Sequence, residues 1–190
     1  MKPYEIEVVP GEASLNELSK GDYPDAGAPW RDTPGGGAAD SGQPAVLSFD
    51  PVQACDFDAM ADLRALAMQP SLERLDRFDP ERSRRRLRAG FVPARMRWIC
   101  LNGERVGFYS LFAHESAWCL DHFYLHPCAQ GRGVGSAVMR LLCAQTQEAP
   151  MRVAALRASE SNAFYRRHGF VRTGESEWDI EYERAAGPVS

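Results

Sequence analysis

Residues 125–136 read LHPCAQGRGVGS and decide the fold of this chain. An apolar segment at 117–125 precedes the stretch, as expected of a strand, and a helical apolar stripe follows it to about Gln147. Glycines at 131, 133 and 135 let backbone N–H groups converge on an anion without obstruction by Cβ atoms, and a helix start adds a favourable dipole. The sequence therefore predicts an anion-binding turn between a strand and a helix.

Two other phosphate-binding motifs do not fit this turn. A P-loop needs Gly-Lys-Ser/Thr, and no lysine occurs after Lys20. A dinucleotide fingerprint needs a third glycine where Val138 stands, and the preceding chain is not one strand–helix–strand unit. A tight turn without a ligand would need fewer than three glycines in five residues.

Hydrophobic periodicity and turn signals predict the remaining elements. We expect strands at residues 46–49, 96–101, 105–113, 117–125, 153–156, 170–173 and 178–182. We expect helices from Asp56 or Asp58 to Met68, where Pro70 ends the first, from Asp79 onward, at 131–147 and at 160–168. The pair Asn102-Gly103 between two apolar runs predicts a hairpin. This order predicts an α/β or α+β mixed sheet with helices on both faces.

Length and composition are those of an ordinary globular protein, with 190 residues, 44% apolar and 25% charged. No run of about 18 apolar residues is present, so we expect no membrane span. The first residues do not read as a secretory signal. The five cysteines are odd in number and lack a C-x-x-C pair, so we expect neither a disulfide framework nor a metal site. These features predict a cytoplasmic protein.

The charge is distributed unevenly along the chain. Residues 1–58 carry 3 basic and 11 acidic side chains, whereas the remaining 132 residues carry 19 basic and 15 acidic ones. An acidic leader on a mildly basic body argues against a nucleic-acid binder. The arginines of the second helix, residues 82–88, are interpreted as a solvated face, with a phosphate or nucleic-acid patch as the alternative.

The chain is predicted to have one folded domain with extensions at both ends. Residues 1–44 form an acidic arm and a Gly/Pro-rich linker, residues 45–184 the domain, and residues 185–190 a tail. A short strand is predicted at Tyr4–Val8. The sequence leaves open whether this strand docks on its own chain, on the partner subunit of a homodimer, or on neither.

Two motifs resemble those of a known family. Gln130-Gly131-Arg132-Gly133-Val134-Gly135 fits the Q/R-x-x-G-x-G/A signature of the GCN5-related N-acetyltransferases (GNAT). Residues 162–170, NAFYRRHGF, resemble the second signature of that family, a Tyr followed by Gly-Phe. The resemblance covers about residues 45–183. It implies an acyl-CoA N-acyltransferase fold with a central mixed, mostly antiparallel sheet flanked by helices.

The resemblance implies acetyl-CoA as the acetyl donor. Its pyrophosphate would lie on the backbone amides of residues 131–136, and its pantetheine arm would pair like an extra strand with the backbone of Phe123 and Leu125. The cofactor-binding residues implied in this way are Phe123, Leu125, Gln130, Gly131, Arg132, Gly133, Val134, Gly135, Ser136, Asn162 and Arg167.

Acetylation of an amine needs its neutral form, which is about one part in a thousand at pH 7 for an alkylammonium, so a base is useful. Strand periodicity puts Cys119, Asp121, Phe123 and Leu125 on one face, and His122 on the other if no bulge intervenes. The resemblance implies a bulge at this place. Asp121 is the first candidate for the base or for an ammonium anchor, and His122 is the second, with a structural role as the alternative. Tyr165 is the candidate proton donor to the departing thiolate, with core packing as its alternative.

The sequence thus predicts an N-acetyltransferase that moves an acetyl group from acetyl-CoA to a primary amine of a small molecule or a protein by direct transfer in a ternary complex. The alternative is a non-catalytic acyl-CoA-binding sensor that regulates through its acidic arm. Trp98, Trp118 and Trp178 are expected to pack in strands, and Trp118 or Tyr109 is a candidate for lining the acceptor pocket.

Overall fold

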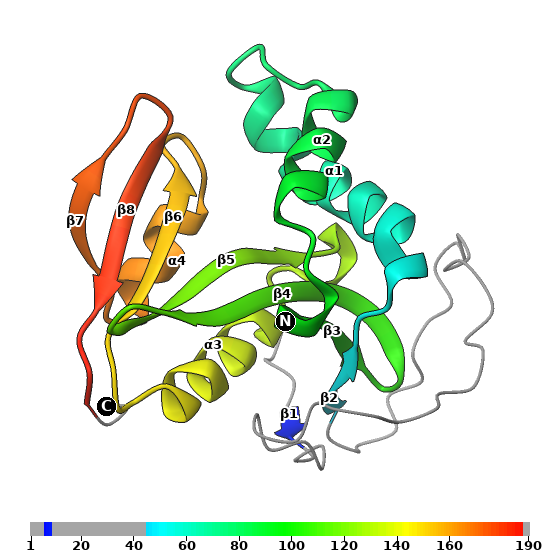
Figure 1. Ribbon diagram of the computed structural model, residues 1–190. Helices are drawn as coiled ribbons and strands as arrows, with labels where there is room; N and C mark the ends of the chain where they lie inside the picture. Colours follow the sequence, from blue (N-terminus) through cyan, green and yellow to red (C-terminus); the bar gives the residue numbers. More distant parts are fainter. Residues whose placement is uncertain (1–5, 9–44, 188–190) are drawn as a thin grey trace.

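The computed structural model describes residues 6–8 and 45–187. They form an eight-stranded sheet in the order β1-β2-β3-β4-β5-β6-β8-β7 (Figure 1). The strands are β1 (Ile6–Val8), β2 (Ala45–Pro51), β3 (Met96–Leu101), β4 (Glu104–His114), β5 (Ala117–Leu125), β6 (Met151–Leu156), β7 (Val171–Glu175) and β8 (Asp179–Arg184). Only the β1–β2 and β5–β6 pairs are parallel within this sheet. The predicted mixed, mostly antiparallel sheet is therefore confirmed.

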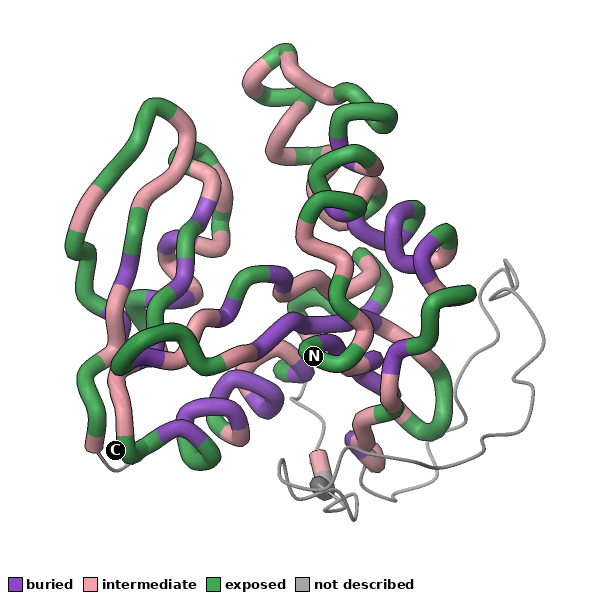
Figure 2. The backbone as a smooth tube through the Cα atoms, viewed as in Figure 1, coloured by how far each residue is buried: buried purple, intermediate pink, exposed green. Residues whose placement is uncertain are grey.

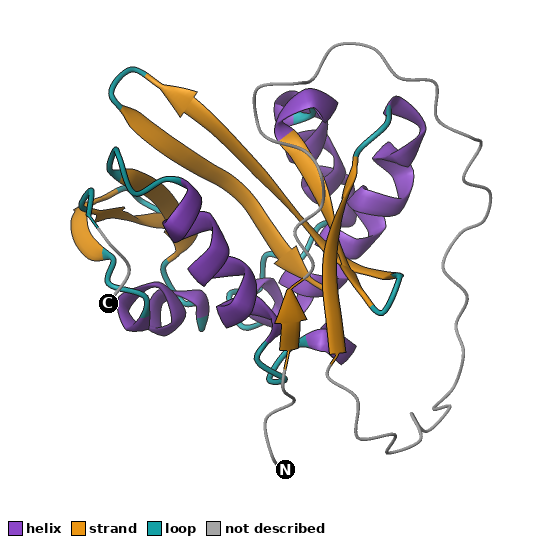
Figure 3. Cartoon of the chain, turned by 90° about the horizontal axis from the view of Figure 1, so that it is seen from below, coloured by secondary structure: helices purple, strands orange, loops and turns teal. Residues whose placement is uncertain are grey.

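Helices cover both faces of the sheet (Figure 3), as predicted. The helices are α1 (Phe57–Glu73), α2 (Pro80–Gly90), α3 (Val134–Gln145) and α4 (Ser161–Arg167), with short 3-10 turns η1 (Ala54–Asp56), η2 (Pro93–Arg95) and η3 (Pro127–Ala129). None of the helices in the described residues is long and apolar enough to cross a bilayer.

Local signals explain where the second helix and the hairpin form. Asp79 caps α2 by accepting a hydrogen bond from the Arg82 N–H at 3.0 Å, and Pro80 occupies the first helical position. Asn102 and Gly103 have φ angles of 53° and 82°, the left-handed pair that a two-residue hairpin between β3 and β4 needs. The predicted helix start and the predicted hairpin are both confirmed.

The first and third helices depart from the predicted boundaries. Pro70 does not end α1, which continues to Glu73, where the Arg74 N–H donates to the Pro70 carbonyl at 3.4 Å. Proline removes only its own N–H from the helical ladder, so its carbonyl still accepts. The third helix starts at Val134 rather than 131, because Gly131 and Gly133 have positive φ angles.

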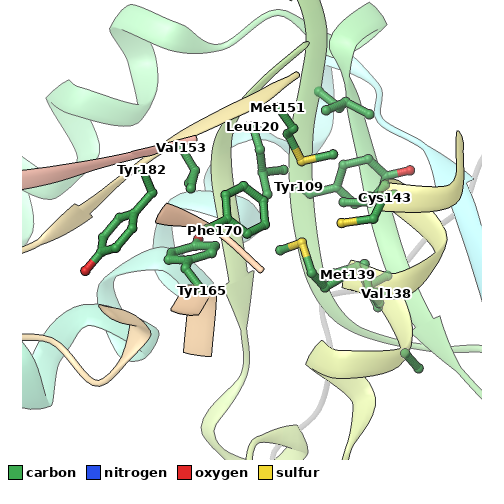
Figure 4. Packing of buried hydrophobic residues seen from close by; sticks show 14 of the residues in the cluster. Tyr109, Leu120, Val138, Met139, Cys143, Met151, Val153, Tyr165, Phe170 and Tyr182 are labelled. Atoms are coloured by element: carbon green, nitrogen blue, oxygen red, sulfur yellow. The ribbon is translucent and has the colours of Figure 1, made fainter. Parts of the chain in front are cut away.

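Two apolar clusters lie on opposite faces of the sheet. The cluster under α1 and α2 includes Met60, Leu87 and Phe108. The larger cluster joins α3 and α4 to the sheet, and Figure 4 shows Val138 and Met139 of α3 beside Tyr109, Leu120 and Met151. Buried residues run along β4 and α3 (Figure 2), which places the centre of the main core between them.

The sheet is interrupted between β5 and β6. These strands pair only over residues 118–120 and 151–153, although β5 continues to Leu125 and β6 to Leu156. Beyond the paired residues the two strands separate, which divides the sheet into two wings (Figure 1). The space for a ligand arises from this separation.

Three residues of the predicted N-terminal arm belong to the sheet. β1 pairs in parallel with β2, with Ile6 opposite Ala45. Ile6 is half-buried against the main core, and a methyl group added to Gly133 would lie 3.9 Å from its Cδ1 atom. Of the predicted arm and linker at 1–44, residues 1–5 and 9–44 lie outside the described residues, as do residues 188–190 of the predicted tail at 185–190.

Candidate active site

A cleft of about 730 Å³ opens where β5 and β6 separate. Its walls are the end of β5, the glycine-rich turn, β6, the start and body of α4, and the last turns of α1. The residues that line it are Ala67, Met68, Pro70, Ser71, Arg74, Asp121, Phe123, Tyr124, Leu125, Gln130, Gly131, Gly133, Gly135, Ser136, Ala154, Ala155, Leu156, Ser159, Glu160, Ser161, Phe164, Tyr165 and Arg167. The glycine-rich turn and both members of the predicted Asp121 and Tyr165 pair therefore share one cleft.

The glycine-rich turn has the backbone geometry of an anion site. Gly131 and Gly133 have φ angles of 69° and 87°, which L side chains rarely adopt. The first bond of α3 runs from the Ala137 N–H to the Gly133 carbonyl at 3.0 Å. The N–H groups just before Ala137 thus have no place in the helical ladder and lie at the positive end of the helix.

This turn also has the room that a phosphate needs. A methyl group added to Gly131 would find no atom within 4 Å, and Gly131, Gly133 and Gly135 all line the cleft. Convergent N–H donors at a helix start, with no Cβ atoms in front of them, fit a pyrophosphate. The residues present therefore fit the diphosphate part of a CoA thioester.

Most of the predicted cofactor residues lie in this cleft, but three do not line it. Arg132 is turned toward the Cys128 carbonyl, 3.5 Å from its Nη1, and Val134 is buried in the main core. The Asn162 amide donates to three carbonyls, of Leu156 at 2.8 Å, Arg157 at 3.1 Å and Ser159 at 2.8 Å. Its oxygen accepts from the Tyr182 hydroxyl at 3.1 Å. Asn162 thus shapes the loop after β6 rather than the cleft surface.

Gln130 and Ser136 line the cleft but already have partners within the chain. Gln130 Nε2 donates to the Leu125 carbonyl at 2.8 Å, at the end of β5. Ser136 Oγ lies 3.1 Å from His168 Nε2. Both contacts fix the glycine-rich turn against its neighbours, so its donors are held in place before any ligand arrives.

A β-bulge at Asp121 and His122 changes which residues of β5 share a face. Tyr109 pairs with Phe123 and Leu111 with Leu120, so two residues of β5 stand opposite Ser110 of β4. Leu120 and Phe123 consequently pack on the same main core. The predicted single face from Cys119 to Leu125 was wrong, because the extra residue shifts the alternation of side chains.

The bulge brings Asp121 and His122 together at the edge of the cleft. His122 Nε2 lies 3.5 Å from Asp121 Oδ2, and no hydrogen-bond partner of Nε2 occurs in the described part of the chain. The two side chains differ in exposure, 9% for His122 and 53% for Asp121. Burial lowers the pKa of His122, the Asp121 carboxylate opposes this effect, and nearby Arg64 adds to it. His122 is therefore neutral at pH 7 while Asp121 faces the cleft.

Tyr165 lies on α4 with its ring in the main core. Its ring meets Phe164, Phe170 and Tyr182 at centroid distances of 5.5, 5.6 and 6.1 Å. The residue is 5% exposed, and burial raises the pKa of its hydroxyl, with the neighbouring Tyr124 as a smaller cause. The side chain is thus both a packing residue and a protonated hydroxyl at the cleft.

Tyr124 is a cleft residue that the sequence did not reveal. Its hydroxyl accepts a hydrogen bond at 3.2 Å from Nε of Arg64, a buried arginine of α1. The Arg64 Nη1 donates at 3.0 Å to the Ser83 carbonyl and also reaches the Ser83 hydroxyl. The Arg64 guanidinium thus holds the Tyr124 hydroxyl in position. The two residues are 60 positions apart in the sequence, so no local pattern links them.

The open end of the cleft is bridged by two contacts between the wings. Arg74 lies 4.0 Å from Glu160 and 3.5 Å from the Ala158 carbonyl. The Arg77 guanidinium stacks 3.4 Å from the centre of the Trp178 ring. Trp178 lies in the bend before β8 and contacts the α1–α2 connection, so the expectation that it packs within a strand was wrong.

Trp118 and Tyr109, the candidates for the acceptor pocket, do not line the cleft. Trp118 is half-buried on the main core, and Tyr109 is buried, with burial raising the pKa of its hydroxyl to about 12. Within the described residues, no group of three or more His, Cys, Asp or Glu side chains is arranged to hold a metal ion.

The fold and the cleft together define a class of proteins in which a mixed sheet splits between two parallel strands beside a glycine-rich turn. Residues 94–172 match the family model described as the acetyltransferase (GNAT) domain. This match confirms the resemblance seen in the motifs over residues 94–172. No curated protein matches the sequence closely enough to count as a relative.

Solved structures share this fold at low sequence identity. An acetyltransferase from Thermus thermophilus is 20% identical with a TM-score of 0.59, covering 73% of this chain and 96% of that one. The PaiA N-acetyltransferase from Thermoplasma acidophilum, solved in complex with coenzyme A, is 12% identical with a TM-score of 0.56, at 73% and 98% coverage. The ribosomal-protein-S18-alanine N-acetyltransferase from Escherichia coli is 13% identical with a TM-score of 0.56, at 76% and 96% coverage.

Proposed function

We propose that this protein is an N-acetyltransferase that moves an acetyl group from acetyl-CoA to a primary amine, directly, with both substrates bound. The observation that carries the proposal is the cleft itself. It connects the glycine-rich turn at one end of β5 with Asp121, at the β-bulge, and with Tyr165. One elongated ligand in this cleft would thus reach the turn proposed to bind its diphosphate and the two groups proposed to transfer protons.

In this proposal the glycine-rich turn binds the pyrophosphate, with Arg167 at the cleft wall as an additional cation. The pantetheine arm follows β5, where Phe123 and Leu125 have no partner strand from β6. The same separation leaves Ala154 and Leu156 of β6 on the opposite wall. A ligand with amide groups can hydrogen-bond to backbone that faces such a gap, as an added strand would.

Asp121 is the proposed base for the amine. It lines the cleft, is half exposed, and attracts an ammonium ion before it accepts the proton at Oδ2, directly or through a water molecule. His122 is buried and neutral, with Nε2 directed at Asp121. It remains the second candidate for the base, because a neutral imidazole can accept a proton.

Tyr165 is the proposed acid. As the amine nitrogen forms its bond to the acetyl carbon, the C–S bond breaks, and the Tyr165 hydroxyl supplies the proton that converts the leaving thiolate to a thiol. Because burial raises the pKa of this hydroxyl, it is protonated throughout the physiological range. The ammonium nitrogen loses two protons: Asp121 takes the first and passes it to solvent, and the second replaces the proton that Tyr165 gave to the thiolate. One proton is therefore released overall when an ammonium and acetyl-CoA become an amide and CoA.

The test combines binding with turnover. Calorimetric titration of acetyl-CoA measures the cofactor site, and release of free thiol with a panel of amines measures transfer. The proposal expects binding together with turnover on at least one amine. Binding without turnover on every amine would instead indicate the acyl-CoA sensor, and absence of binding would remove the cofactor assignment.

A further inference from the structure

The solvent side of α2 carries a cluster of arginines. Arg82, Arg85 and Arg86 are exposed, and we call them the basic face of α2. Arg85 lies 3.9 Å from Asp79 with both side chains largely in solvent. Neither Arg82 nor Arg86 has a carboxylate within 4 Å in the described part of the chain. Within the described residues, Arg82 and Arg86 thus carry positive charge that no ion pair compensates.

The other two arginines of α2, Arg84 and Arg88, have a structural role, because they bind residues of α1. Arg84 forms an ion pair with Asp58 of α1, and Arg88 stacks 3.3 Å from the centre of the Phe57 ring. Arg82 and Arg86 of the basic face make no such contact within the described residues. Like charges one turn apart, such as Arg82 and Arg86, repel each other, and a cation in the first helical turn opposes the helix dipole.

The basic face lies beside the proposed base. α2 ends at Gly90, where an added methyl group would lie 3.0 Å from His122 Nε2 and 3.4 Å from Asp121 Oδ2. With a rise of about 1.5 Å per residue, Arg86 is about one turn and Arg82 about two turns away from Gly90 along the helix. If the amine of an acceptor molecule lies at Asp121, the groups that follow this amine in the molecule can therefore lie next to α2.

The cleft mouth also carries acidic side chains, of which Glu160 lies 4.0 Å from Arg74. Glu160, which is 94% exposed, lines the cleft on the α4 side, and Glu177 is exposed in the turn between β7 and β8. Asp121 and Glu160 suit the cationic amine itself. The basic face suits anionic groups that follow the amine at a distance of one to two helical turns.

We propose that the acceptor is an amine carried by an acidic polypeptide segment, whose carboxylates bind the basic face of α2. This inference rests on the proposed acetyltransferase function and names its substrate class. Arginine fits carboxylates particularly well, because its guanidinium makes paired hydrogen bonds to both oxygens. A peptide chain also places successive carboxylates at spacings that arginines one turn apart can reach.

A nucleic acid fits this surface less well. α2 exposes no aromatic side chain on which a base could stack. An oligonucleotide therefore serves as the competing ligand in the test.

The test measures binding of fluorescein-labelled peptides to the full chain by anisotropy. The peptides share a free N-terminal amine and one lysine and differ only in a following block of glutamates, of glutamines or of lysines. We expect the glutamate peptide to bind about tenfold more tightly than the glutamine peptide at low salt, equivalent to about 1.4 kcal/mol, with the difference shrinking as salt is raised.

Two variants locate the effect. Arg82→Glu/Arg86→Glu should abolish the preference for the glutamate peptide. If this charge reversal unfolds α2, the milder Arg82→Gln/Arg86→Gln takes its place and should reduce the preference. Arg140→Glu is the matched control, because Arg140 is an exposed arginine on α3, on the other face of the sheet. The control should leave the preference unchanged.

Equal binding of the three peptides would overturn the inference, as would a preference that survives in both α2 variants. Tighter binding of an oligonucleotide of equal charge, in competition with the glutamate peptide, would assign the basic face to nucleic acid instead. Failure of the acetyltransferase proposal is seen separately, as absence of calorimetric acetyl-CoA binding or of thiol release with small amines.

Discussion

Replacing Tyr165 by phenylalanine separates its two roles at the cleft. The ring contacts with Phe164, Phe170 and Tyr182 are made by carbon atoms, so Tyr165→Phe retains them. What the variant removes is the hydroxyl. The folded structure and the shape of the cleft should therefore stay as they are, and any loss should lie in the chemical step.

The expected loss follows from the size of general acid catalysis. A positioned acid contributes about 10²–10⁴-fold, so kcat should fall by that factor, equivalent to about 2.7–5.4 kcal/mol in the barrier. Acetyl-CoA affinity should change by less than about tenfold, because a neutral hydrogen bond contributes roughly 0.5–1.5 kcal/mol.

The pH dependence gives a second signature. Loss of the Tyr165 proton removes the acid, so kcat of the wild type should decrease as pH rises through the pKa of this hydroxyl. Burial raises that pKa, so the decrease belongs above pH 10, near or beyond the ordinary value for tyrosine. Tyr165→Phe should lack this alkaline limb.

The assay is thiol release with the best amine of the panel, with a protein blank for the five cysteines of the chain. Tyr182→Phe is the matched control: it removes a buried hydroxyl that donates to Asn162 Oδ1 at 3.1 Å and should cost about 1 kcal/mol of stability with kcat nearly unchanged. A Tyr165→Phe enzyme with near-normal kcat would refute the reasoning. The thiolate would then take its proton from water or from the ammonium of the acceptor.

Three further changes test other parts of the structure. Gly135→Ala should weaken acetyl-CoA binding in calorimetry by about tenfold, because its methyl group fits 3.4 Å from Leu125 Cδ1 but occupies cleft space. Gly174→Ala on β7 is the control, and unchanged affinity in the first variant or an equal loss in the second would contradict this prediction. A chain that begins at Gln43 lacks β1 and should melt only a few degrees lower, since half-burial of Ile6 contributes about 1 kcal/mol; a much larger drop would make β1 integral to folding. Because burial lowers the pKa of His122, its imidazole binds a proton more readily in the unfolded chain, and stability to urea should fall as pH drops below about 6.5. His122→Gln should flatten part of that fall. An unaltered pH profile of stability would count against a buried neutral His122.

Gly133 shows how the structure changes an experiment that the sequence suggests. From the sequence alone, Gly133→Val should block the anion site and leave the fold intact. The observed φ of 87° means that any side chain at this position strains the backbone, so reduced binding by that variant would have two explanations. Gly135 lies in the helix with an ordinary φ and tests the cleft without this strain.

Features governed by short-range signals could be predicted from the sequence. The cap at Asp79, the hairpin at Asn102-Gly103 and the glycine-rich turn each depend on a few neighbouring residues, and all were placed correctly. Asp121 and Tyr165 were brought to the same cleft by the fold that the motifs implied. Local sequence signals therefore account for much of the fold, and the motifs point to the proposed base, Asp121, and the proposed acid, Tyr165.

Features that depend on distant residues could not be predicted. Strand periodicity alone gives the wrong face at Asp121, because the β-bulge arises from pairing with β4 and only the family resemblance implies it. The Arg64–Tyr124 hydrogen bond and the Arg77–Trp178 stack join segments that only the completed sheet brings together. Asn162 had a cofactor role by resemblance, but its amide is used by carbonyls of its own loop.

The separation of β5 from β6 has a consequence for the behaviour of the protein in solution. It creates two inner sheet edges in addition to the outer edges at β1 and β7. Outer edges can recruit strands from other molecules, whereas the inner ones lie within a cleft too narrow for a folded neighbour. Their amide hydrogens should exchange rapidly with deuterium in the free protein and slowly once a narrow chain lies between them. The pattern of newly protected amides would then trace the path of the ligand residue by residue, before any substrate is identified.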